Sequence, residues 1–91
     1  MRKFLIEREI PGVGRFDSCA LAEAARKSNG VLAELAPRVQ WQQSYVTDER
    51  TFCIYLAEDE AAIREHAARS GFPANRIIEI RGVIDPSTAI T

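Results

Sequence analysis

A chain of 91 residues, 46% hydrophobic and 27% charged, has the composition of one globular domain rather than of a disordered segment. Its formal net charge of −1, from 12 basic and 13 acidic residues, argues against the basic surface of a nucleic-acid-binding protein. No apolar run approaches the roughly 20 residues that cross a bilayer, and the N-terminal apolar run is too short for a signal peptide, so we expect a cytoplasmic protein.

The first element is a predicted strand over residues 3–10. Phe4 and Ile6 share one of its faces, with Arg8 at the end of that face. The other face carries Leu5, Glu7 and Glu9. The proline and two glycines that follow end the strand.

A long helix is predicted over residues 18–36, which are dense in strong helix formers. Asp17 or Ser18 can cap its first turn, and Pro37 ends it. Asn29-Gly30 is a point where this helix could kink or split.

A β-hairpin is predicted over residues 39–56, because the polar segment 47–50 separates two runs rich in β-branched and aromatic residues. Strict alternation puts one set of side chains on one face of its first strand: Val39, Trp41, Gln43 and Tyr45. In its second strand, alternation gives a wholly apolar face of Phe52, Ile54 and Leu56, which leaves Cys53 and Tyr55 on the other.

A second helix is predicted to start at the acidic residues 58–60, because the helix dipole favours negative charge at its first turn. Ile63, His66, Ala67 and Ser70 share the face expected to point toward the sheet, and Gly71 suits the C-terminal end. A last strand is predicted over residues 75–84, with Ile78 and Ile80 on one face and Ile77, Glu79 and Arg81 on the other.

The order β-α-β-β-α-β predicts a single α+β domain, residues 1–91, with a ferredoxin-like fold. Right-handed crossovers place both helices on one face of a four-stranded antiparallel sheet of order 4-1-3-2. The face predicted to lie under the helices is Phe4, Ile6, Val46, Phe52, Ile54, Leu56, Ile78 and Ile80. The open face would then carry Trp41, Tyr45, Cys53, Tyr55 and Ile77 among its charged residues, which is too apolar for water. We therefore predict a homodimer that packs sheet against sheet as a dimeric α+β barrel.

The segments KFLIEREIPGVG, QWQQSYVTDERTFCIYLAEDEAAIREHAARSGFPANRI and RGVIDPSTA together resemble the DUF4242 family, over nearly the whole chain. That family is described as nickel-responsive or nickel-binding-protein-like, is largely uncharacterised, and has a dimeric ferredoxin-like fold. The resemblance implies a small homodimer that binds a divalent transition metal, nickel first, without turnover. Glu7, Tyr45, Tyr55 and His66 match positions of the family pattern.

His66 is the only histidine, and so the only imidazole ligand for a metal ion. Glu7 or Glu9 could add oxygen ligands. One histidine in each subunit leaves most of an octahedral shell to carboxylates, water or a second subunit, and no HxH, HxxxH or CxxC motif occurs. In the alternative interpretation, His66 is a core histidine with a hydrogen-bond partner, and the glutamates form interface ion pairs with Arg8 or Arg81.

Trp41, Tyr45 and Tyr55 could line a pocket for a flat apolar ligand. This arrangement suggests a second hypothesis, a cofactor-independent, monooxygenase-like enzyme in which His66 is the acid or base; otherwise no residue is assigned a catalytic role. These aromatic residues could equally form the core of a dimer, and the third hypothesis is a structural or interaction module. Cys19 and Cys53 are expected to be buried thiols rather than a disulfide.

Overall fold

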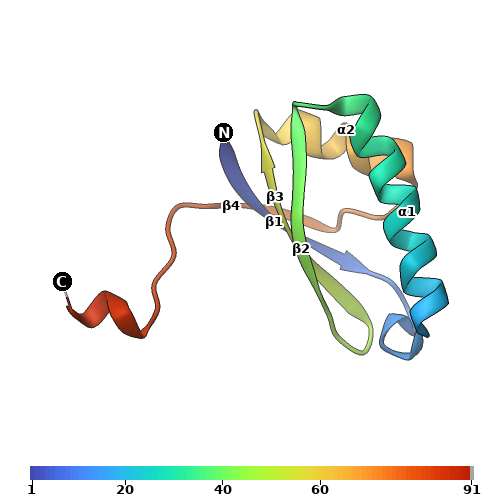
Figure 1. The fold of residues 1–91 in the computed structure, drawn as a ribbon, viewed down its shortest axis with the longest axis horizontal. Helices are drawn as coiled ribbons and strands as arrows, with labels where there is room; N and C mark the ends of the chain where they lie inside the picture. Colours follow the sequence, from blue (N-terminus) through green and yellow to red (C-terminus); the bar gives the residue numbers. More distant parts are fainter. Residues whose placement is uncertain (91) are drawn as a thin grey trace.

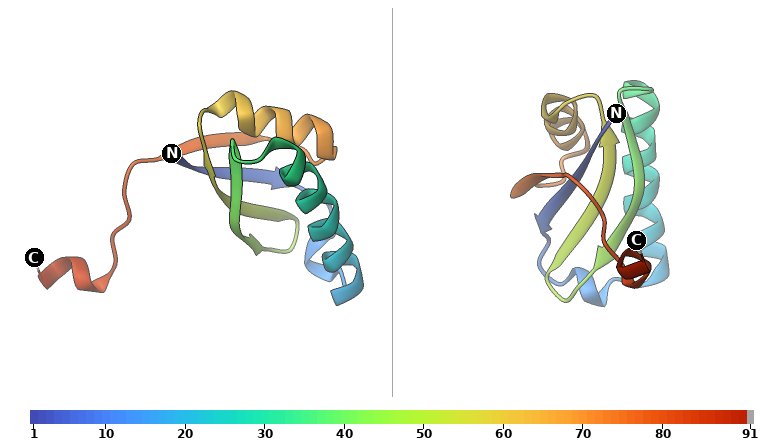
Figure 2. Two further views of the ribbon diagram at one scale, coloured as in Figure 1. Left: turned by 45° about the horizontal axis from the view of Figure 1, so that its top comes forward. Right: turned by 90° about the vertical axis from the view of Figure 1, so that its left-hand side faces the viewer.

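The computed structural model describes residues 1–90 and confirms the α+β architecture (Figure 1). Its elements in chain order are β1 (Arg2–Glu9), the 3-10 helix η1 (Val13–Arg15), α1 (Ser18–Leu35), β2 (Val39–Val46), β3 (Arg50–Ala57), α2 (Glu60–Ser70), β4 (Arg76–Ile80) and the 3-10 helix η2 (Pro86–Ile90). The sheet order is β2-β3-β1-β4, as predicted, and every pair is antiparallel. Both helices cover the same face of the sheet (Figures 1 and 2).

Both helices begin at an aspartate whose side chain caps the first turn. Asp17 accepts a hydrogen bond of 2.8 Å from the Ala20 N–H, and Asp59 accepts one of 2.9 Å from the Ala62 N–H. Helix α1 continues without interruption through Gly30. Helix α2 ends at Gly71, whose φ of 78° lies in the left-handed region that glycine adopts without strain.

The faces of β3 are the reverse of those predicted. Register pairs Phe4 with Tyr55 and Ile6 with Cys53, so the smaller, mixed set of β3 side chains lies under the helices. The wholly apolar set, Phe52, Ile54 and Leu56, is only partly buried and lies on the open face. Both sets are largely apolar, so alternation within β3 could not decide between them; pairing with β1 does.

The faces of β2 depend on an irregularity that strict alternation could not predict. Trp41 pairs with Tyr55, yet Gln43 pairs with Ile54, so the register shifts by one residue between them. A β-bulge of this kind moves the following side chains to the other face. Trp41 therefore lies on the helix side, which corrects its predicted place beside Tyr45, whereas Tyr45 stays on the open face.

Strand β4 is also shorter and reversed relative to the prediction. It ends at Ile80 rather than at residue 84. Ile77 pairs with Ile6 and packs against the core, whereas Ile78 pairs with Leu5 and is 41% exposed on the open face. Beyond β4 the chain leaves the sheet and runs away from the body of the domain to η2 (Figures 1 and 2).

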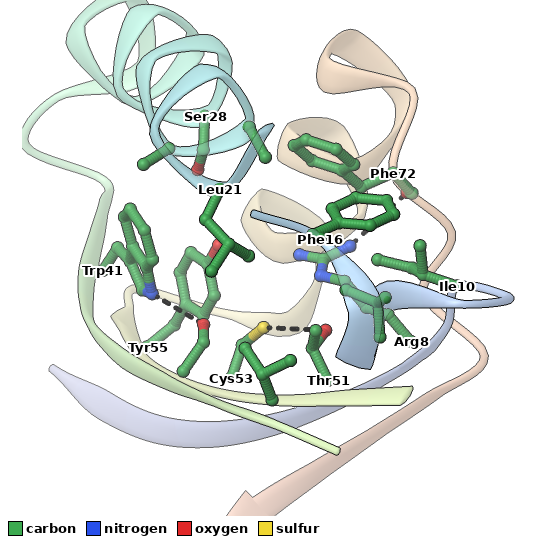
Figure 3. A pocket seen from close by; sticks show the side chains of 15 residues that line it. Arg8, Ile10, Phe16, Leu21, Ser28, Trp41, Thr51, Cys53, Tyr55 and Phe72 are labelled. Carbon is green, nitrogen blue, oxygen red and sulfur yellow. Dashed lines mark hydrogen bonds between the residues drawn. The ribbon is translucent and has the colours of Figure 1, made fainter. Parts of the chain in front are cut away.

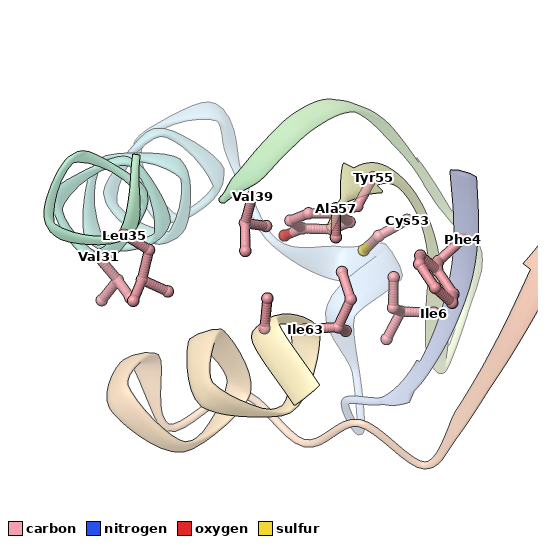
Figure 4. Close-up of a cluster of buried hydrophobic side chains, with 10 residues drawn as sticks. Phe4, Ile6, Val31, Leu35, Val39, Cys53, Tyr55, Ala57 and Ile63 are labelled. Atoms are coloured by element: carbon pink, nitrogen blue, oxygen red, sulfur yellow. The ribbon is translucent and has the colours of Figure 1, made fainter. Parts of the chain in front are cut away.

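The hydrophobic core lies between β1, β3 and the two helices (Figure 4). Its buried residues are Phe4, Ile6, Val31, Leu35, Val39, Cys53, Tyr55, Ala57, Ala62 and Ile63. Cys53 is buried, as expected, but Cys19 is exposed at the start of α1, which corrects the prediction of two buried thiols; neither is in a disulfide. Within residues 1–90, no helix combines the length and apolar character that crossing a membrane requires.

The η1 loop is held against the turn of the β2–β3 hairpin. The Gly14 N–H donates a hydrogen bond of 3.0 Å to the Asp48 carbonyl. A Cβ atom at Gly14 would lie 2.7 Å from the Asp48 Cα and 2.8 Å from the Thr47 carbonyl oxygen, so only glycine allows this approach. The contact places Val13, the buried residue of η1, beside the sheet.

Candidate functional site

A cavity of about 320 Å³ lies between the N-terminal half of α1 and the helix side of the sheet (Figure 3). Its size is at the low end of the range for small-molecule sites. Most of its lining is apolar, and the polar exceptions are Arg8, Ser28, Ser44 and Thr51 with the Tyr55 phenol. The full lining is Arg8, Ile10, Val13, Phe16, Leu21, Ala24, Ala25, Ser28, Trp41, Ser44, Val46, Thr51, Cys53, Tyr55 and Phe72.

Arg8 is the one charged residue of this lining, and it is only 3% exposed. It lies inward because β1 alternates, so Arg8 continues the buried face of Phe4 and Ile6. Its Nη1 donates a hydrogen bond of 2.8 Å to the Pro73 carbonyl and one of 3.4 Å to the Phe72 carbonyl. Its Nη2 is buried and has no hydrogen-bond partner.

His66 lies on the inner face of α2, as predicted, and is 0% exposed. Its Nε2 shares a hydrogen bond of 3.1 Å with the Ser28 hydroxyl of α1, whereas its Nδ1 is buried without a partner. The imidazole ring centre lies 5.3 Å from that of Tyr55, which stacks on Trp41 at 6.5 Å. The single histidine thus joins both helices to β3.

The groups around Arg8 are uncharged at neutral pH. Burial and, next, the positive charge of Arg8 lower the pKa of His66 from 6.5 to about 4. Burial is also the main cause that raises the pKa of the Tyr55 phenol above its usual value. Neither ring therefore supplies a negative charge to balance the guanidinium.

The three predicted metal ligands do not come together within one chain. Glu7 lies on the open face, 3.4 Å from Arg50 and 3.7 Å from Arg76, and the exposed Glu9 forms an ion pair of 3.1 Å with Arg50. His66 lies on the opposite side of the sheet, on the inner face of α2. Among residues 1–90, no group of three or more histidine, cysteine, aspartate or glutamate side chains is placed to hold a metal ion.

The predicted aromatic trio is divided between the two faces. Trp41 and Tyr55 line the cavity under α1. Tyr45 is exposed on the open face, where its hydroxyl accepts a hydrogen bond of 2.6 Å from Gln43. The β2 bulge is the cause of this separation.

The sequence reasoning missed the roles of Arg8 and Ser28. Arg8 was expected to pair with glutamates, but it shares no ion pair with any residue in the described part of the chain. Its alternation with Phe4 and Ile6 was the available signal that it points inward. Ser28 stands between the polar residues Lys27 and Asn29, and its only signal was its helical spacing, three or four residues from Ala24, Ala25, Val31 and Leu32.

Comparisons with known proteins agree with the motif resemblance. A family model described as "Nickel responsive protein SCO4226-like" matches residues 4–80. The crystal structure of SCO4226 from Streptomyces coelicolor A3(2) superposes with a TM-score of 0.76 at 18% identity, covering 90% of this chain and 99% of that one. This similarity shows a shared fold. No curated protein matches the chain, and the DUF4242 label stays a prediction.

Proposed function

The chain belongs to the SCO4226-like family of nickel-responsive proteins, and we propose that it is a homodimer that takes part in a nickel response by binding rather than by catalysis. The observation that carries the proposal is the family match over residues 4–80. Binding without turnover is supported by His66, the predicted acid or base, which is fully buried and does not line the cavity.

The homodimer is supported by the open sheet face. Tyr45 and Ile78 are exposed there, and Phe52, Ile54 and Leu56 are only partly covered. Exposed apolar surface of this kind is typical of an interface. Arg50 and Arg76 flank Glu7 on this face, so it carries both positive and negative charge. A second copy related by a two-fold axis could therefore pair its arginines with this copy's Glu7, and its Glu7 with this copy's arginines.

The side chains of one copy do not fit a nickel ion. The Nδ1 of His66 is buried without a partner, but the positive Arg8 lies close enough to lower the pKa of His66. No group of metal-binding side chains joins His66 in residues 1–90. We therefore place no metal beside His66. Direct nickel binding would have to use ligands from two copies, with Glu7 and Glu9 on the proposed interface as the candidates.

A calorimetric titration of Ni²⁺ into the metal-free dimer tests direct binding. We expect saturable binding by the wild type, loss of that binding in the Glu7→Gln/Glu9→Gln variant, and unchanged binding in His66→Ala. Loss in His66→Ala alone would make His66 a ligand and contradict the site at the interface. The absence of saturable binding in the wild type would contradict direct nickel binding.

A further inference from the structure

We propose that the cavity under α1 binds a small apolar carboxylic acid, whose carboxylate pairs with Nη2 of Arg8 and whose hydrocarbon part fills the space toward Trp41. This proposal is independent of the nickel response. It concerns a site on the helix side of the sheet, away from the glutamates of the open face.

The first argument is the state of the Arg8 guanidinium. A buried charge is stable only when it is paired or fully hydrogen-bonded, and a buried N–H without an acceptor carries a desolvation cost. Nη1 is satisfied by backbone carbonyls, but Nη2 is not, and Arg8 lines the cavity. An oxyanion in the cavity would supply the missing acceptor and the missing charge together.

The second argument is the absence of a counter-charge around Arg8 in the described chain. The rings that face it belong to Tyr55 and Phe72, whose centres lie 5.9 Å and 6.0 Å from the guanidinium carbon. These aromatic faces attract the cation but do not neutralise it. Since the lining contains no carboxylate, the cavity carries a net positive charge that selects an anion.

The third argument is the apolar remainder of the lining. Phe16, Leu21 and Val46 line the cavity and are themselves exposed, so the cavity reaches the surface between η1, α1 and β2. Figure 3 places Arg8 beside Phe16 and Phe72 on one side of the cavity and Trp41 on the other. A strongly hydrated polyanion would not cover this apolar lining, whereas the hydrocarbon part of a carboxylic acid would remove it from water.

Three probes with the same hydrocarbon chain test the charge preference: octanoate, 1-octanol and octylammonium. Trp41 is the only tryptophan and lines the cavity, so its fluorescence reports occupancy. We expect octanoate to bind about tenfold or more tighter than octanol, as one charge-assisted hydrogen bond predicts, and octylammonium not to bind. Equal affinity for octanoate and octanol, or no binding of octanoate, would overturn the proposal.

Variants of Arg8 locate the carboxylate. Arg8→Gln should weaken octanoate binding by about tenfold or more and leave octanol binding unchanged, whereas Arg8→Lys should keep part of the preference for octanoate. Undiminished octanoate binding in a folded Arg8→Gln variant would overturn the assignment of Arg8.

Variants of the apolar cavity lining locate the hydrocarbon chain while Arg8 is kept. Ala24→Phe fills the cavity and should abolish binding of both octanoate and octanol, whereas Ala68→Phe, on the exposed surface of α2, should change neither. Retained binding in a folded Ala24→Phe variant would place the probe outside the cavity and overturn the proposal. This test also holds if the Arg8→Gln variant does not fold.

Discussion

His66 and Arg8 are polar residues buried beside a hydrophobic core, and each keeps one nitrogen without a partner. The two side chains differ in the charge that they carry when buried. The imidazole can stay neutral, so its burial costs little at neutral pH, whereas the guanidinium remains charged. This difference makes His66 a pH-dependent element of the core and Arg8 a fixed source of positive potential.

The neutral state of His66 predicts a loss of stability on acidification. Its pKa is about 4 in the folded protein against 6.5 unfolded, so the unfolded chain binds more protons between these values. The stabilisation is complete above pH 6.5 and is lost as the pH falls toward 4, by about 3 kcal/mol. Urea unfolding at pH 7.5 and pH 4.5 measures this change.

A His66→Gln variant serves as its control, because glutamine has no titrating group and can still bond with Ser28. The variant should lose less stability than the wild type between the two pH values. The same loss in both proteins would contradict the neutral, buried state of His66.

For single residues, the direction of a side chain was predictable where its neighbours at helical spacing are apolar. His66 shares a helix face with Ile63, so its inward direction was predictable, and the structure confirms it. The partners of His66 and Arg8 were not predictable, because Ser28 and the Phe72 carbonyl are brought in by long-range packing.

Among the elements, η1 and the turn of the β2–β3 hairpin pack backbone against backbone at Gly14. Strand β2 adds a bulge that turns Trp41 inward and leaves Tyr45 outward. The loop and the bulge each supply residues to the cavity wall, so its shape depends on irregular backbone rather than on ideal strands.

We predict that Gly14→Ala destabilises the protein by about 1–3 kcal/mol, because the new methyl group meets backbone atoms that cannot rotate away. Gly82→Ala is the matched control, since no atom lies within 4 Å of its added Cβ. Chemical denaturation of the two variants should show a loss for Gly14→Ala alone. Equal stability would mean that the loop moves off the hairpin at little cost.

The four strands and two α-helices were predictable in number and order, but the two 3-10 helices and the faces of three strands were not. Asp17 and Gly71 mark helix ends by local chemistry, and the structure confirms both. Strands β3 and β4 carry apolar residues on both faces, so their orientation depends on pairing with β1, a contact between distant segments. Strand β2 contains no glycine, a residue that often marks a β-bulge, so its bulge could not be recognised from the local sequence.

For the whole molecule, the reversed faces alter the composition of the proposed interface and leave its apolar character intact. The surface predicted for dimerisation contained Cys53 and Tyr55, whereas the open face carries Phe52, Ile54 and Ile78. The topology itself followed from element order and crossover handedness, so it was predictable from the sequence.

We predict that Ile78→Glu dissociates the proposed homodimer, because it places a charge in an apolar interface. The expected loss is about 2 kcal/mol or more, roughly 30-fold in the dissociation constant. Sedimentation analysis measures it, with Ala68→Glu on the exposed surface of α2 as the control. A wild type that sediments as a monomer at every accessible concentration would contradict the proposal.

The order of the strands has a consequence for synthesis on the ribosome. Strand β1 is made first, but it lies between β3 and β4, which are encoded far downstream. At about 5–20 residues per second, several seconds pass before both neighbours exist. Until β3 is made, β1 has two unpaired edges, and one edge stays unpaired until β4 follows, so the hydrogen bonds of the first strand are complete only when the last strand has been translated.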